Sequence, residues 1–465
     1  MPVTAANWSV RRRPRLWPTS ALFHNDLALV ILSSLAVFNI NLVGSLPGCE
    51  LAVLIMLPFL FLSHGARAFK GEYLWFYMLL VLWLFGTVFG DLYLGSMMTN
   101  RAKGIARVTF LGLDFMTLAI LINGKTRGKI AFTLGFVPVM LSIAFAFRQD
   151  FLVAWKFGLG YAITLLAMLV SCNFYAQKRY RISVSIALGM AALNFIFAAR
   201  SQTAVDLISL VLVLPVFGRN WSPKGVPRKR AEAYRIVVTL TLACGAAYAS
   251  NQAIKFGANH GFFDENTQDK FQTQEAGRLG VFVGGRPETL VAIQAIRDSP
   301  IIGHGSFAVD RKYNILQKDI EYENGYAFSD DASEDEGGIP AHSHLTQSWV
   351  ESGLFGGIFW ICVLLLNFRG ILLLISRGSP MAPLYSFLLV GFAWDILYSP
   401  MGSFDRIWGA FAILITCDLV KTASLEDRLA RKPVIVKRVI GSPVRVTRPR
   451  PFGRPISGRQ ERSVL

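Results

Sequence analysis

The stretch YLWFYMLLVLWLFGTVFGDLYLG, residues 73–95, decides what kind of protein this is. Its only charged residue is Asp91, and nearly every other side chain is apolar. About 20 such residues in a helix cross the hydrocarbon core of a bilayer. A helix also satisfies its own backbone hydrogen bonds, which lipid cannot do. Residues 73–95 therefore predict a membrane-spanning helix.

The composition of the whole chain agrees with this prediction. Of the 465 residues, 53% are hydrophobic and 17% are charged, and the mean hydropathy is +0.44. Soluble domains carry about 25% charged residues, so these values argue against a soluble enzyme, a disordered chain or a fibrous chain. The five cysteines lie in or beside apolar runs without a CxxC pair, so neither a disulfide framework nor a zinc site is predicted.

Comparable apolar runs recur along the chain and predict an all-α polytopic membrane protein with about twelve transmembrane helices. The expected spans are 27–46, 49–65, 73–95, 105–123, 130–147, 152–174, 182–199, 202–218, 236–254, 351–369, 383–400 and 405–420. No small-residue cleavage site ends the first run, so we expect an uncleaved first span and not a signal peptide.

The distribution of Lys and Arg predicts the orientation of these spans. Basic residues gather in alternate connections, near residues 67–70, 125–129, 178–181 and 219–235. Such connections face the cytoplasm, so both termini are expected there too. The cluster of Arg101, Lys103 and Arg107 is an exception, because it falls at an external connection. The net charge of +17 is then explained by cytoplasmic segments facing anionic lipid, without nucleic acid.

The same pattern divides the chain into five segments. Residues 1–26 are a basic cytoplasmic N-terminus, and 27–254 hold transmembrane helices 1–9. Residues 255–345 form one large, partly helical periplasmic loop, and 346–420 hold helices 10–12. Residues 421–465, rich in Arg, Pro and Gly, are expected to be a disordered cytoplasmic tail. The acidic run 330–336 lacks the spacing of a cation-binding loop and is interpreted as solvated chain.

Within the loop, residues 286–299 (RPETLVAIQAIRDS) carry Leu290, Ile293 and Ile296 at helical spacing. Pro287 suits the first helical position, which puts Arg286 at the helix amino terminus. Free N–H groups and a guanidinium there suit a phosphate or diphosphate. The alternative is a surface Arg286 paired with a nearby acid. The following residues 300–305 (PIIGHG) predict a tight turn with close backbone approach.

The loop returns to the membrane through residues 341–353, AHSHLTQSWVESG. In a helix, Ser343, Gln347 and Glu351 fall on one stripe, with His342 at its start. A histidine is suited to accept a hydroxyl proton near neutral pH. The alternative is interfacial capping of an ordinary span, with Trp349 in the aromatic belt.

Arg200 ends the seventh expected span on the external side. An arginine at that depth either reaches towards the interface with its long side chain or binds an anion there. Asp206, in the next span, is a possible partner for it.

In this order, these features resemble the membrane O-antigen ligases and the related lipopolysaccharide and exopolysaccharide polymerases. An Arg-Ser step, Arg200-Ser201, lies between two spans. A large loop follows, in which Arg286 opens an amphipathic helix that ends in Pro-x-x-Gly-x-Gly. His342 then precedes Glu351 by nine residues and Gly353 by eleven. Where the family often has Asn after the His, this chain has Ser343, followed by a second His, His344.

The resemblance implies a bacterial inner-membrane enzyme that moves a glycan from undecaprenyl diphosphate to an acceptor sugar on the periplasmic face. It implies that Arg200 and Arg286 bind the diphosphate and that His342 is catalytic, with support from His344, Gln347 and Glu351. It implies an inverting transfer without metal or cofactor. The acceptor is lipid A core in a ligase and another carrier-linked repeat in a polymerase. Ser343 and the Gln347-x-Trp349 step look closer to the exopolysaccharide polymerases.

A multi-span transporter of a polysaccharide or lipid-linked precursor is the alternative function. Twelve spans with both ends inside is also a common count for transporters. Transporters, however, tend to have paired halves with broken helices at the midplane, and no such pairing is visible in this sequence.

The expected orientation can be tested by cysteine labelling. In a variant without the five native cysteines, we expect an impermeant thiol reagent to label Ser329→Cys in intact spheroplasts but not Ser442→Cys. Positive segments remain on the cytoplasmic side, which puts residue 442 inside and residue 329 outside. Labelling of Ser442→Cys alone would reverse the topology.

Overall fold

The computed structural model of the chain describes residues 24–41, 44–214, 228–261, 268, 287–323, 338–431, 435–437 and 443–445. Met1–Lys421 forms one compact unit and Thr422–Leu465 a second. Within the described residues, eight helices are long and apolar enough to cross a membrane. The protein is therefore an all-α, multi-span membrane protein, as its composition predicts.

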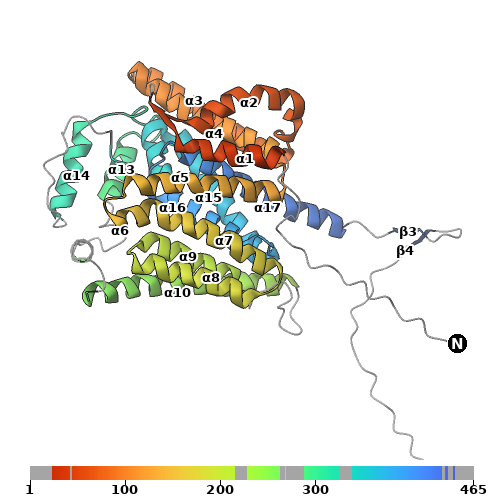
Figure 1. The fold of residues 1–465 in the computed structure, drawn as a ribbon. Helices are drawn as coiled ribbons and strands as arrows, with labels where there is room; N and C mark the ends of the chain where they lie inside the picture. The colour runs from red at the N-terminus through yellow and green to blue at the C-terminus, as the bar shows by residue number, and fades with distance from the viewer. Residues whose placement is uncertain are drawn as a thin grey trace, which may run out of the picture. The chain divides into compact units, whose positions relative to one another are not determined.

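In its described residues, the first unit is a bundle built mainly from helices (Figure 1). Its elements are α1 (His24–Ser34), β1 (Asn39–Asn41), β2 (Ser45–Pro47), α2 (Gly48–His64), α3 (Gly71–Tyr93), α4 (Met98–Ile122), α5 (Thr126–Ala146), α6 (Phe151–Ala154), α7 (Gly160–Ala176), α8 (Tyr180–Ile196), α9 (Arg200–Val213), α10 (Arg228–Asn259), α13 (Pro287–Asp298), α14 (Arg311–Glu323), α15 (His344–Arg377), α16 (Ala382–Tyr398) and α17 (Asp405–Arg431). A π-helical turn, Trp155–Leu159, joins α6 to α7 into one long helix.

Helix α15 lies at the centre of the packing. It contacts α3 on one side and α16 on another, while α9 packs against α8, α10 and α16. Aromatic rings fill the centre of the bundle: Phe76 meets Phe115 with 4.2 Å between ring centroids, and Trp83 meets Phe359 at 4.7 Å. Such buried rings add dispersion contact between helices, which is needed where lipid removes the hydrophobic driving force.

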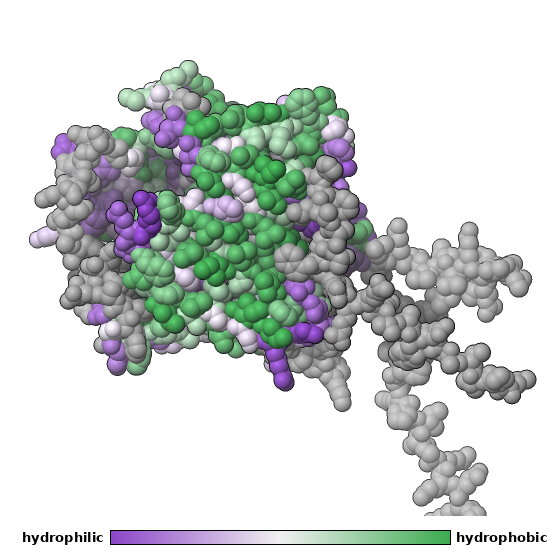
Figure 2. Space-filling view, in the orientation of Figure 1, coloured by the Kyte–Doolittle hydropathy of each residue, from purple (hydrophilic) through white to green (hydrophobic). Residues whose placement is uncertain are grey.

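The outer face of the bundle is apolar, as a lipid-facing surface must be. Figure 2 shows hydrophobic residues over the middle of the visible face and hydrophilic ones gathered towards two ends. Large side chains such as Phe59 and Leu62 are 71% and 86% exposed on α2. In water this would be a costly surface, whereas lipid solvates it.

Two predicted segments differ from the structure. The first expected span, 27–46, is helical only as far as a 3₁₀ turn, Leu35–Val37, and then forms an antiparallel hairpin in which Asn39 pairs with Pro47. Polar Asn and Ser residues and Pro47 there disfavour a continued helix. In the expected tail 421–465, α17 continues to Arg431, and β3 (Ile435–Lys437) pairs with β4 (Pro443–Arg445). The remaining tail lies outside the described residues.

The helix predicted for residues 286–299 is confirmed as α13, with Pro287 as its first residue. Its buried side, however, is Val291, Ala292 and Ala295, and Ile293 is 40% exposed. The small alanines let α13 lie close to its neighbours α14 and α15. Helical spacing predicted that the larger aliphatic side chains would be buried. The structure instead buries smaller side chains, which allow closer packing.

One ion pair is buried between helices at the α17 side of the bundle. Lys129 Nζ lies 2.8 Å from Asp418 Oδ2, with both side chains under a tenth exposed. Tyr73 donates a hydrogen bond of 3.0 Å to Asp418 Oδ1. These contacts tie α3, α5 and α17 together, and each charge depends on its partner because desolvation is costly.

We expect Lys129→Met to lower stability by about 3–5 kcal/mol, since it leaves Asp418 as an uncompensated buried charge. The double variant Lys129→Met/Asp418→Leu should recover most of that loss. The measurement is the thermal unfolding midpoint of purified protein in detergent. Equal midpoints for the single and double variants would mean that the pair does not act as a unit.

Candidate functional site

Helix α15 is broken at Gly353, close to its amino-terminal end. Gly353 has φ +60° and ψ −149°, whereas the residues on both sides of it are helical. A break frees backbone hydrogen-bonding groups that must find other partners. The turn Pro300–Gly305 supplies them: His304 N donates to Val350 O (2.7 Å), Gly305 N donates to Glu351 O (3.1 Å), and Ile301 O accepts from Leu354 N (3.0 Å).

Two glycines make this docking possible. A Cβ added to Gly353 would lie 2.0 Å from Ile301 O, and one added to Gly303 would lie 2.6 Å from Gly353 N. Gly303 also has φ +82°, in the region that glycine adopts at no steric cost. The tight turn and close backbone approach predicted for residues 300–305 are therefore confirmed. The structure further reveals what the turn approaches, which is the Glu351–Gly353 step.

Helix α3 holds the same turn from the other side. Asp91, only 1% exposed, accepts hydrogen bonds from Ser306 N and Ser306 Oγ, both at 2.7 Å. Thr87 lies 2.9 Å from the hydroxyl of Ser352. The lone charge of the 73–95 stretch is thus a carboxylate that anchors a distant turn.

Gln347 and Glu351 lie on one stripe of α15, as predicted, and interact. Gln347 Nε2 donates to Glu351 Oε1 (3.3 Å), and Gln347 Oε1 accepts from Met401 N (3.0 Å). The other oxygen of Glu351 accepts from Arg107 Nη1 at 2.6 Å. The side chains of Arg107 and Glu351 are 6% and 12% exposed, so this is a buried, charge-assisted contact.

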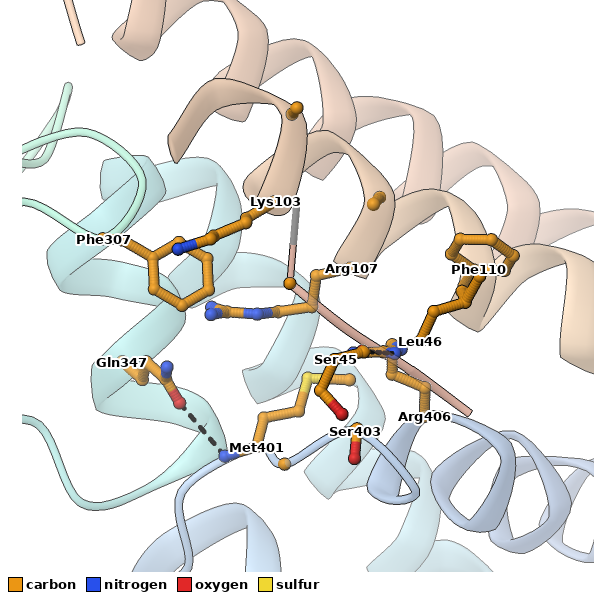
Figure 3. Close-up of a pocket in the computed structure, with 14 residues that line it drawn as sticks. Ser45, Leu46, Lys103, Arg107, Phe110, Phe307, Gln347, Met401, Ser403 and Arg406 are labelled. Atoms are coloured by element: carbon orange, nitrogen blue, oxygen red, sulfur yellow. Dashed lines mark hydrogen bonds between the residues drawn. The ribbon is translucent and has the colours of Figure 1, made fainter. Parts of the chain in front are cut away.

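A cavity of about 490 Å³ opens beside this ion pair (Figure 3). It is lined by α4, the β1–β2 hairpin, Phe307, Gln347 and the start of α17. The lining residues are Gly44, Ser45, Leu46, Ala102, Lys103, Ala106, Arg107, Phe110, Phe307, Gln347, Met401, Gly402, Ser403 and Arg406. A smaller cavity of about 110 Å³ shares Phe307 and Gln347 and is lined also by Gly305, Ala341 and Glu351.

Basic side chains converge on the larger cavity. Lys103 and Arg107 extend from α4 towards Phe307, whose ring centroid lies 5.5 Å from Lys103 Nζ and 4.3 Å from Arg107 Cζ (Figure 3). Arg406 Nη2 donates to Glu50 Oε2 at 2.9 Å. These cations were not predicted as site residues. The sequence did mark the two on α4, because Arg101, Lys103 and Arg107 lie at an expected external connection, whereas the other basic clusters lie at expected cytoplasmic connections.

The two candidate histidines occupy opposite environments. His342 is exposed and precedes α15, because Ser343 is the N-cap and accepts a hydrogen bond from Thr346 N (2.9 Å). His344, the first helical residue, is 2% exposed and packs 4.9 Å from the ring of Trp360. Only His342 of the two is open to a soluble reactant. It follows Ala341, which lines the smaller cavity.

Of the two arginines predicted to bind the diphosphate, the structure describes only Arg200. Arg200 is the first residue of α9 and is half-buried, but it lines neither of the two cavities. Asp206, its possible partner, accepts a hydrogen bond from Asn194 Nδ2 at 2.7 Å. Arg286 lies outside the described residues. Among the described residues, the structure thus brings together the turn, Gln347 and Glu351.

Helices α13 and α14 are held together beside the turn by Asp298. Hydrogen bonds from Lys312 and Tyr313 hold the pKa of Asp298 at about 2. Tyr313 OH donates to Asp298 Oδ2 at 2.7 Å. Because this pKa lies below the usual value near 3.9, the contact stabilises the fold above that value and is lost as the pH falls towards 2. The clamp is therefore intact at neutral pH.

Comparison with known proteins leaves the family open. No protein-family model, curated protein or solved structure matches this chain. Among the described residues, no group of three or more His, Cys, Asp or Glu side chains is placed to hold a metal ion.

We expect Gly353→Ala to displace the docked turn, because the added methyl meets Ile301 O and the backbone conformation alone costs a non-glycine residue about 1–3 kcal/mol. Hydrogen–deuterium exchange should report faster exchange at His304 and Gly305, whose amides bond to α15. Gly189→Ala is the matched control, since a Cβ there meets nothing within 4 Å. Unchanged protection at residues 304–305 in Gly353→Ala would contradict the docking.

Proposed function

We propose that this protein transfers a glycan from an undecaprenyl diphosphate carrier to an acceptor sugar at the periplasmic face of a bacterial inner membrane. The proposal includes about twelve spans, cytoplasmic termini and a periplasmic loop 255–345. The observation that carries it is the docking of Pro300–Gly305 on Glu351–Gly353. The Pro-x-x-Gly-x-Gly turn and the Glu351–Gly353 step are two separate motifs of the resemblance to glycan ligases and polymerases. Their docking makes them one structural unit.

The chemistry needs help mainly on the acceptor side. A sugar hydroxyl is a weak nucleophile, whereas the carrier diphosphate is already a good leaving group. In the proposed reaction the acceptor oxygen attacks the anomeric carbon and the bond from that carbon to the diphosphate oxygen breaks. The diphosphate leaves with the bonding electrons, and His342 takes the hydroxyl proton. A single displacement inverts the anomeric centre.

The exposure of the two histidines supports His342 as the base. A general base must come within hydrogen-bond reach of the proton that it accepts. His344 is enclosed against Trp360, so its proposed role is to shape the start of α15. Arg200 and Arg286 are proposed to neutralise the diphosphate, for which the planar guanidinium is suited.

Glu351 and Gln347 are proposed to hold the substrate-facing surface rigid. Glu351 is engaged by Arg107 and by Gln347, and Gln347 also accepts from the Met401 backbone. Because both of its oxygens are engaged by donors, we propose that Glu351 acts as a support and not as the base. We propose no metal and no cofactor. A polymerase, which adds carrier-linked repeats to one another, is the form of the reaction that we favour over a ligase.

We expect His342→Ala to lower transfer by about 10²–10⁴-fold, the usual contribution of a positioned base. The assay uses purified protein, a carrier-linked oligosaccharide donor and EDTA, with product length read on gels. The control is His344→Gln, which keeps a side chain of similar size at the buried position and should transfer at near wild-type rate.

Several results would contradict the proposal. Full activity of His342→Ala, or a well-folded His344→Gln without activity, would move the base elsewhere. Loss of transfer in EDTA with recovery in a divalent ion would refute the metal-free mechanism. Wild-type protein that moves labelled carrier-linked glycan across vesicles without extending it would be a transporter.

A further inference from the structure

The cavity of about 490 Å³ between α4, the β1–β2 hairpin and α17 has a charge pattern of its own. Three cations line it, and two of them are already matched. Arg107 pairs with Glu351 at 2.6 Å, and Arg406 makes two hydrogen bonds to Glu50, which is fully buried. Removing two charges from water is tolerable only with such direct pairing.

Lys103 is the exception among these cations. It is half-buried, and within the part of the chain that the structure describes no carboxylate forms an ion pair with it. Its recorded electrostatic contact is with the ring of Phe307. Asp405, next to the lining residue Arg406 in sequence, accepts a hydrogen bond from Gly402 N (2.7 Å). The lining therefore carries one cation that no carboxylate of the described residues matches, at the end of a flexible stem.

The remaining lining suits a sugar. Phe110 and Phe307 offer apolar ring surface, while Ser45, Ser403 and Gln347 offer hydroxyl and amide groups. Sugar rings present just this combination of C–H faces and hydroxyl rims. The volume falls in the range of about 300–1,000 Å³ that small-molecule sites occupy. A compact ammonium group such as that of Lys103 pairs with one oxyanion as a point charge.

We propose that this cavity binds a monoanionic sugar, one bearing a single carboxylate, with its carboxylate on Lys103. This rests on the proposed function, because it names the acidic sugar of the glycan substrate as the ligand of a site beside Gln347 and Glu351. A single unmatched cation fits one carboxylate better than a diphosphate, which carries more than one charge. The cavity thus selects acidic glycans over neutral ones.

The test compares two ligands and three proteins. The ligands are a trisaccharide that contains one glucuronic acid and the same trisaccharide with that carboxyl group reduced to the alcohol. The proteins are the full chain in lipid nanodiscs, Lys103→Gln, and Arg101→Gln. Arg101 is a matched control, because it lies two residues away on α4, carries the same charge and does not line the cavity. Affinities are measured by isothermal titration calorimetry.

We expect wild-type protein to bind the acidic trisaccharide about 10-fold more tightly than the reduced one, which is the scale of one charge-assisted hydrogen bond. Lys103→Gln should bring this ratio close to one, and Arg101→Gln should leave it unchanged. No preference in wild-type protein, or a preference kept by Lys103→Gln, overturns the proposal. Inorganic diphosphate binding that depends on Lys103 without a carboxylate preference also overturns it, and makes the cavity a diphosphate site.

Failure of this inference and failure of the proposed function give different results. If purified protein performs the transfer and Lys103→Gln keeps its carboxylate preference, the function stands and the acidic-sugar site does not. If transfer is absent but the preference depends on Lys103, the sugar site stands and the enzymatic function does not.

Discussion

The packing of the Pro300–Gly305 turn against the start of α15 depends on a constraint on the backbone. Non-helical backbone at or near membrane depth persists only where protein satisfies its polar groups. The break of α15 at Gly353 meets this condition because the Pro300–Gly305 turn donates to Val350 and Glu351 carbonyls and accepts from Leu354. Asp91 holds the following Ser306. The turn, and helix α13 that precedes it, are thereby fixed at a defined point on the bundle.

That fixed point also determines what surrounds the cavity. Phe307, two residues beyond the docked turn, forms one wall, while Gln347 and Glu351 approach from the short part of α15 that precedes the break. Arg107 links this part to α4, and Gln347 links it to the Met401 loop. Segments far apart in the chain thus meet through one charge-assisted contact and one neutral hydrogen bond, of which the charge-assisted contact is the stronger.

Much of this could be predicted from the sequence, and the failures have physical causes. Long apolar runs predicted the membrane helices, and Pro287 marked the start of α13 correctly. Glycine spacing in 300–305 predicted a close approach, but its target on α15 depends on tertiary packing that a linear pattern does not contain. Lys103 and Arg107 stood out in the sequence only because they lie at an expected external connection, where few basic residues are expected. Arg107 meets Phe307 across 200 residues of sequence and Glu351 across 244.

The facing glycines at 303 and 353 carry an evolutionary consequence. A Cβ on either glycine would collide with the backbone of the docked segment: one on Gly303 meets the Gly353 amide nitrogen, and one on Gly353 meets Ile301 and Ile302, just before Gly303. A substitution of either glycine by a larger residue therefore disrupts the docking of the turn on α15. In descendants of this chain the two positions should stay glycine together, or be lost together when the turn leaves the helix. The pair is therefore inherited as one character, although fifty residues separate its members.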